Sequence, residues 1–189
     1  VDRRQRQMCI RDSGTSVLGE SEISNAGKQI VRLHMVPADA PATKSAVQAI
    51  RDADVLIFGP GSLYTSVLPN LLVPGIRDAV LASKAFKIYV CNVMTQPGET
   101  DGYGAYDHVK ALIDHVGKQF LDYVIVNDQE ISEEQKKMYR AKGQEYVTPD
   151  IEQIEQLGIK PIPTRLISKE DMVRHDPQKL AMVLISLIY

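Results

Sequence analysis

The most informative pattern along the chain is a short apolar run that passes at once into a loop rich in glycine and hydroxyl side chains. Val55–Phe58 contains no polar residue, which is typical of a strand buried on both faces of a sheet. Glycines let a turn bring its backbone close to a ligand, and hydroxyls can donate hydrogen bonds to it. The candidate phosphate contacts are Gly59, Gly61, Ser62, Thr65 and Ser66, and the alternative is an ordinary turn that satisfies its own polar groups.

Strand-like and helix-like spacings of apolar residues alternate along the rest of the sequence. This alternation predicts an α/β fold with a mostly parallel sheet and helices on both of its faces. Strands are predicted at residues 15–20, 29–36, 55–58, 87–92, 121–126 and 160–167, and helices at 44–52, 104–116, 132–142 and from Pro177 onwards.

A second polar loop, residues 92–102, follows the predicted strand at 87–92. In an open parallel sheet the ligand binds beyond the carboxyl ends of the strands, so both loops should lie at one edge. Asn92, Thr95 and Gln96 offer amide and hydroxyl groups that suit a polar, uncharged moiety such as a sugar or a base. The alternative is that these side chains only cap the loop.

Two acidic residues in the second loop are weak candidates for a metal site. Glu99 and Asp101 could hold Mg²⁺ beside a diphosphate, because magnesium often takes only one or two carboxylates from the protein. The alternative is a solvated pair or a helix cap. Ser62 and Ser66 have no histidine near them in sequence, so no catalytic residue is predicted.

Two residues in the second half of the chain are further candidates for contacts with a ligand. A Ser132–Gln135 capping box predicts a helix that carries Tyr139 near its end. Arg174 precedes the last helix, where a guanidinium could bind an anion through two hydrogen bonds. The alternatives are a surface tyrosine and a solvated arginine. Asp176 is predicted to be a structural helix cap.

Composition narrows the classes of function. The chain has 189 residues, 44% of them hydrophobic, and a formal net charge of −2, which argues against a nucleic-acid partner. No apolar run approaches the roughly 20 residues of a membrane span, and the first residues are charged, unlike a signal peptide. Cys9 and Cys91 make neither a disulfide framework nor a zinc site. We therefore expect a cytoplasmic protein without a membrane span, and a homo-oligomer is possible.

The first 13 residues do not fit the pattern that follows them. The run at residues 3–7 is dense in charge, and residues 1–13 are predicted to be a spurious or disordered lead-in. The alternative is a basic arm for an acidic partner. Residues 14–189 are predicted to form one α/β domain.

Long contiguous motifs make the chain resemble the gluconeogenesis-factor family, in the superfamily of 2-phospho-L-lactate transferase (CofD-like). The resemblance covers residues 14–189, and its motifs are residues 18–21, 59–75, 92–102, 107–108 and 174–180. It implies a Rossmann-like fold, a bacterial cytoplasmic protein and a regulatory role in growth and cell shape on gluconeogenic carbon sources. It also implies a UDP-linked nucleotide-sugar as ligand and unknown regulatory protein partners.

One departure from that family concerns the first phosphate loop. Family members begin with a strand and a Gly-Gly-Gly-Thr-Gly turn, and this sequence has no such turn. The chain is therefore expected to be N-terminally truncated, to lack its first β-α unit and to bind ligand weakly. The rival hypothesis is a Mg-dependent enzyme like 2-phospho-L-lactate transferase. The transferase branch tends to have Ser-Asn-Pro after Gly-Pro, whereas this chain has Gly61-Ser-Leu-Tyr64.

Overall fold

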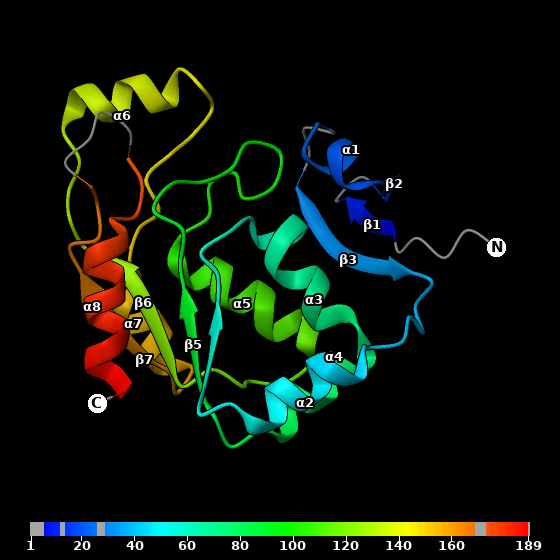
Figure 1. Cartoon of the computed structure of the whole chain (residues 1–189). Helices are drawn as coiled ribbons and strands as arrows, with labels where there is room; N and C mark the ends of the chain where they lie inside the picture. The colour runs from blue at the N-terminus through cyan, green and yellow to red at the C-terminus, as the bar shows by residue number, and fades with distance from the viewer. Residues whose placement is uncertain (1–5, 12–13, 26–28, 169–172, 189) are drawn as a thin grey trace.

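A four-stranded parallel sheet forms the centre of the molecule in a computed structural model, which describes residues 6–11, 14–25, 29–168 and 173–188 (Figure 1). Its strands lie in the order β4-β5-β6-β7, and each neighbouring pair is parallel. The chain therefore has the predicted α/β architecture, in which all four carboxyl ends meet at one edge. The strands are β4 (Val55–Phe58), β5 (Phe86–Val90), β6 (Tyr123–Asn127) and β7 (Lys160–Thr164).

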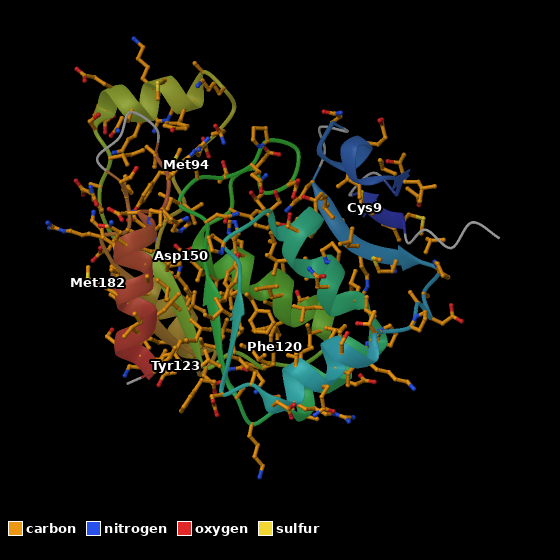
Figure 2. All side chains as sticks on the ribbon, viewed as in Figure 1. Cys9, Met94, Phe120, Tyr123, Asp150 and Met182 are labelled. Carbon is orange, nitrogen blue, oxygen red and sulfur yellow. The ribbon has the colours of Figure 1, made fainter. Side chains whose placement is uncertain are left out.

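Helices cover both faces of this sheet, as predicted. One face packs on α8 (Pro177–Ile188), whose Leu180 meets Ile88 and Ile125, while Met182 points away from the sheet (Figure 2). The opposite face packs on α5 (Ala105–Val116) and its neighbouring helices. The other helical elements are α2 (Lys44–Asp52), the π-helical turn η1 (Leu63–Val67), α3 (Leu68–Leu72), α4 (Pro74–Ala82), α6 (Glu133–Arg140) and α7 (Ile151–Gln156).

A second, antiparallel sheet corrects the prediction for the start of the chain. β1 (Arg6–Arg11) is its middle strand, between β2 (Ser16–Leu18) and β3 (Ile30–Val36), so residues 6–11 are not a disordered lead-in. Cys9 pairs with Val17 and Leu33 and is fully buried. The strand contains only three apolar residues, 8–10, between polar and charged ones, so its sequence does not resemble a buried strand. The strands with which it pairs lie further along the sequence. The rest of residues 1–13 lies outside the described residues.

The sequence predicted that β4 is buried on both faces of the sheet, and the structure corrects this. The segment is a strand, as predicted, but it lies at the edge of the sheet and Ile57 is 45% exposed. Burial of a strand depends on its place in the sheet, which is decided by pairing between distant segments. A further difference is α1 (Glu20–Asn25), a short helix where the predicted strand at 15–20 should end.

Several helix predictions are confirmed with their local signals. Helix α2 has the predicted bounds, and Thr43 Oγ1 caps it by accepting a hydrogen bond from Ala46 N at 3.3 Å. Ser132 Oγ accepts from Gln135 N at the start of α6, as the capping box predicted. Asp176 caps α8 through Oδ1, which accepts from the amides of Gln178 and Lys179. Within the described residues, no helix is long and apolar enough to cross a membrane.

The two histidines of α5 are core residues. His108 is fully buried, and its Nδ1 lies 2.8 Å from the carbonyl oxygen of Gly104. His115 Nε2 accepts a hydrogen bond from Leu33 N at 2.9 Å, which links α5 to β3. The helix is covered by β3 as well as by the parallel sheet, so its buried face is wider than its apolar spacing indicated.

Candidate functional site

A cleft of about 460 Å³ lies beyond the carboxyl ends of β4 and β5. This is the edge at which α/β sheets bind ligands, and the place that the two polar loops predicted. Met94 lies here, among the loops above the sheet (Figure 2). Three segments line the cleft, with the residues Pro60, Gly61, Ser62, Asn92, Val93, Met94, Gln96, Val173, Arg174 and His175.

The first wall is the loop that leaves β4. Gly59 has a φ of +84°, and a Cβ there would stand 3.0 Å from the carbonyl oxygen of Val90. Glycine is therefore required both by the backbone conformation and by the neighbouring strand. After Ser62 the chain enters η1, where the carbonyl oxygen of Ser62 accepts from the amides of Ser66 and Val67. This wide turn keeps Gly61 and Ser62 at the cleft.

The second loop is tied to the first by two side-chain amides. Asn92 Nδ2 donates to the carbonyl oxygen of Gly61 at 3.0 Å, and Gln96 Nε2 donates to Ser62 Oγ at 2.7 Å. The sequence predicted that the two loops share an edge, and the structure joins them by direct hydrogen bonds. Each amide still has a second N–H for a ligand.

The third wall, residues 173–175, is held in place by segments distant in sequence. Val173 N donates to the hydroxyl of Tyr139 at 2.7 Å, and the carbonyl oxygen of Arg174 accepts from Ser168 N at 3.0 Å. His175 Nε2 lies 3.0 Å from the carbonyl oxygen of Cys91, directly after β5. These contacts hold Arg174 and His175 in the lining of the cleft, together with Gly61 and Ser62.

Arg174 gives the cleft its charge. Among the described residues that line it, Arg174 is the only one with a permanent charge, and it forms no ion pair with a described residue. Burial lowers the pKa of His175 below the ordinary value, against a smaller opposing effect of the Cys91 carbonyl. His175 is therefore neutral at physiological pH. The cleft combines one cation with neutral donors and acceptors, an arrangement that suits an anion carrying polar groups.

Some predicted contacts lie near the cleft without lining it. Gly59 and Ser66 line a neighbouring hollow of about 430 Å³ on the other side of the Pro60–Gly61 turn. Thr65 is buried, and its Oγ1 donates to Glu99 Oε1 at 3.1 Å.

Two further predicted contacts support the cleft from behind. Thr95 is buried, and its Oγ1 accepts from Glu145 N at 2.8 Å, which fastens the second loop to residues 144–145. Tyr139 is also buried, in an apolar cluster that includes Val93 and Val173. Its hydroxyl is already used by the Val173 amide, so Tyr139 positions the third wall rather than lining the cleft.

The two acidic candidates for a metal site are not brought together in one hollow. Glu99 is buried against Thr65, whereas Asp101 is exposed and its Oδ2 accepts from Gly98 N at 2.8 Å. Within the described residues, no group of three or more His, Cys, Asp or Glu side chains could hold a metal ion.

The prediction from sequence missed His175, which lies next to the predicted Arg174 in the cleft. The signal available was its position in the family-like motif at residues 174–180. Its contact with Cys91 joins residues 84 positions apart, and no local pattern reveals such a contact. Ser62 does have a histidine across the cleft, but Ser62 Oγ is hydrogen-bonded to Gln96.

A larger cavity, of about 520 Å³, lies at the opposite end of β4 and β5, beside Val55 and Phe86. That end carries the amino termini of the strands, where open α/β sheets do not bind their ligands. We therefore take the cleft at the carboxyl ends as the candidate site.

Comparison with known proteins agrees with this architecture. The family model of 2-phospho-L-lactate transferase CofD matches residues 2–167. The gluconeogenesis factor of Bacillus subtilis is 44% identical over 94% of this chain and 56% of its own length. The gluconeogenesis factor of Halalkalibacterium halodurans is 46% identical over 90% of this chain and 53% of its own length. The chain thus spans about half the length of the curated relatives it matches.

Solved structures show the same fold. A crystal structure of a Bacillus halodurans protein, described as a member of the UPF0052 family, superposes with a TM-score of 0.92 at 43% identity. The superposition covers 96% of this chain and 58% of the other. The family match spans the whole of β1, β2 and β3 as well as the parallel sheet.

Proposed function

This chain belongs to the family of 2-phospho-L-lactate transferase CofD, and on that premise we propose that its cleft binds a nucleotide-sugar, specifically a UDP-linked sugar. The observation that carries the proposal is the composition of the cleft, whose lining combines one guanidinium, a glycine turn, two side-chain amides and the hydroxyl of Ser62. Arg174 suits a diphosphate, because a guanidinium can bind phosphate oxygens through two hydrogen bonds. Asn92, Ser62 and Gln96 suit the hydroxyls of a sugar.

The role that follows is regulatory rather than catalytic. The hydroxyl of Ser62 accepts a hydrogen bond from Gln96 and is not hydrogen-bonded to His175 within the described part of the chain. A serine nucleophile needs a base within hydrogen-bonding reach, and the cleft does not provide this pair. We place the protein in the bacterial cytoplasm as a sensor whose ligand-bound state acts on protein partners. The name of its relatives, gluconeogenesis factor, is consistent with a role in growth on gluconeogenic carbon sources, and we propose a role in cell shape beside it.

The binding proposal is tested by titrating the ¹⁵N-labelled chain with UDP-glucose and UDP-N-acetylglucosamine while amide shifts are followed by NMR. We expect shifts at residues 60–62, 92–96 and 173–175, including at millimolar dissociation constants. Arg174→Ala should weaken binding by roughly 10- to 100-fold, because it removes a charge-assisted hydrogen bond. Arg165→Ala, an exposed arginine outside the cleft, is the matched control. The absence of shifts with either nucleotide-sugar would refute the proposal.

The cellular role is tested separately in a strain that lacks the gene. The wild-type gene should restore growth and cell shape on a gluconeogenic carbon source, and Arg174→Ala should not. Equal rescue by both would show that the cellular role does not depend on the cleft.

A second candidate function is a Mg-dependent transferase of the 2-phospho-L-lactate transferase type, which the family match itself favours. The two predicted magnesium ligands do not line one hollow: Glu99 is bonded to Thr65, and Asp101 lines a different surface hollow. Magnesium-dependent consumption of a phospho-lactate donor by the purified chain would establish this function in place of the regulatory one.

A further inference from the structure

The two ring nitrogens of His175 have different surroundings. Nε2 lies 3.0 Å from the carbonyl oxygen of Cys91, which can only accept a hydrogen bond. Nδ1 has no hydrogen-bond partner among the described residues and is not one of their buried, unpartnered atoms. His175 lines the cleft, and we infer that this nitrogen faces it, since Nε2 is turned to the Cys91 carbonyl oxygen.

The contact with Cys91 fixes the tautomer. A carbonyl oxygen requires a proton on Nε2, so the neutral ring carries its lone pair on Nδ1. Burial disfavours the imidazolium and keeps the ring neutral at physiological pH. His175 therefore presents a hydrogen-bond acceptor to the cleft.

The groups around His175 leave few hydrogen-bond acceptors for a ligand hydroxyl. Arg174 can only donate, and the carbonyl oxygen of Gly61 already accepts from Asn92. Ser62 Oγ likewise accepts from Gln96. A ligand hydroxyl that enters between these groups needs an acceptor for its own proton.

We propose that His175 is a ligand-positioning residue that accepts a hydrogen bond from a sugar hydroxyl through Nδ1. This inference rests on the proposed binding of a nucleotide-sugar and assigns the sugar end of the ligand to the His175 side of the cleft. Cys91 contributes through its backbone, which lies directly after β5 and is held by a hydrogen bond from Cys91 N to the carbonyl oxygen of Ile125 at 3.0 Å.

Few charged or titratable groups surround His175. On its own segment these are Arg174 and Asp176, and Asp176 lies 3.9 Å from Lys179 of α8. The β5 end contributes the Cys91 thiol, whose pKa burial raises far above the physiological range. The glycine loop contributes no charged residue to the cleft. A loss of affinity on acidification below the ordinary range of histidine titration therefore reports on His175 itself.

The test compares UDP-glucose with UDP, which has no sugar hydroxyl beyond the ribose. We expect His175→Phe to weaken binding of UDP-glucose by about 3- to 10-fold, the usual effect of one neutral hydrogen bond, and to leave binding of UDP unchanged. His34→Phe, a histidine on β3 of the small sheet, is the control and should change neither. Thermal unfolding of each variant confirms that it is folded.

Binding of UDP-glucose measured over a range of pH shows whether His175 accepts a hydrogen bond from the ligand or donates one to it. Its diphosphate carries no proton that titrates between about pH 5 and pH 8, the range in which histidine changes charge. Protonation of Nδ1 removes the acceptor, so affinity should fall as the pH drops below about 6.5. His175→Gln keeps an N–H for the Cys91 carbonyl but cannot titrate, so its affinity should stay constant with pH.

Three results would overturn the inference. Affinity for UDP-glucose that rises on acidification would show that the imidazolium binds phosphate. An equal loss for UDP and UDP-glucose in His175→Phe, or no loss for either, would show that Nδ1 does not contact the sugar. If the wild-type chain binds neither ligand, the proposed function fails together with this inference, whereas the first two results leave the proposed function standing.

Discussion

The wall of the cleft that carries Gly61 and Ser62 is built locally, whereas the wall that carries Arg174 and His175 is assembled from distant segments. The first wall follows its strand within a few residues, and its shape comes from Gly59 and the η1 turn. The assembled wall, residues 173–175, lies immediately before α8 and is held by Tyr139, Ser168 and Cys91. The local wall was visible in the sequence, and the assembled wall was visible only as a single arginine.

This difference separates two kinds of residue at the site. Two of the predicted residues of the local wall, Gly61 and Ser62, line the cleft, and the other predicted residues of that wall do not. In the assembled wall, a predicted ligand contact, Tyr139, is a support, and an unpredicted residue, His175, reaches the cleft. Substitutions should therefore act on the local wall through backbone geometry and on the assembled wall through individual hydrogen bonds.

The largest effect is expected from Gly59→Ala, which strains the backbone of the local wall. The left-handed conformation and the 3.0 Å approach to the Val90 carbonyl oxygen should together cost more than about 2 kcal/mol of unfolding free energy. Gly158→Ala is the matched control, with a φ of +74° and no atom within 4 Å, and should cost about 1 kcal/mol. Urea denaturation measures both, and equal losses would show that contact with β5 is unimportant.

The next largest effect is expected from Tyr139→Phe, which removes a hydrogen bond that holds the assembled wall. The Val173 amide loses its partner in a buried setting, so we expect a loss of about 2 kcal/mol and faster hydrogen exchange at that amide. Tyr123→Phe is the control, since the Tyr123 hydroxyl makes no hydrogen bond within the described residues, and it should change stability by less than about 0.5 kcal/mol. Unchanged exchange at Val173 would mean that other contacts hold this wall.

The histidines allow the assembled wall to be compared with the core. Burial holds the pKa of His108, His115 and His175 below the ordinary value of about 6.5. Below that pH the unfolded chain binds protons that the folded chain does not. Stability is therefore complete above pH 6.5 and falls on acidification, by at most about 1.4 kcal/mol per pH unit for each histidine. Urea denaturation at a series of pH values from about 7.5 to about 5.5 measures the slope.

Replacement of single histidines shows which of them cause the dependence of the unfolding free energy on pH. His108→Leu and His175→Gln should each make the dependence of stability on pH less steep, because each removes one buried group that must stay neutral. A slope that neither variant changes would show that other groups control the response to acid.

The smallest effect concerns the hydrogen bond between the two loops. A double-mutant cycle with Ser62→Ala and Gln96→Leu should give a coupling free energy of about 1 kcal/mol for the 2.7 Å bond. The exposed pair Gln48–Asp52 on α2 is the control and should couple by only about 0.3 kcal/mol. If the Ser62–Gln96 pair couples no more strongly, the two loops are not joined through this contact.

Much of the fold was predictable because its signals are local. Helix α2 and the Ser132 capping box follow from the spacing of apolar residues and from cap chemistry within a few positions. The strand β4 and its glycine loop follow from one apolar run and the residues after it. Such signals also predicted that two loops share an edge, and Gly61, Ser62, Asn92, Gln96 and Arg174 do line one cleft.

The sequence by itself therefore determined the elements, their alternation and the polar chemistry of the loops. Only the tertiary structure decided that β1 is the middle strand of a second sheet and that β4 is an edge strand. It also decided that Thr65, Thr95 and Tyr139 use their hydroxyls within the protein, while His175 reaches the cleft. The physical reason is that apolar periodicity and turn chemistry act between neighbours in sequence. Burial and hydrogen bonding of a side chain depend on partners that only the folded chain brings together.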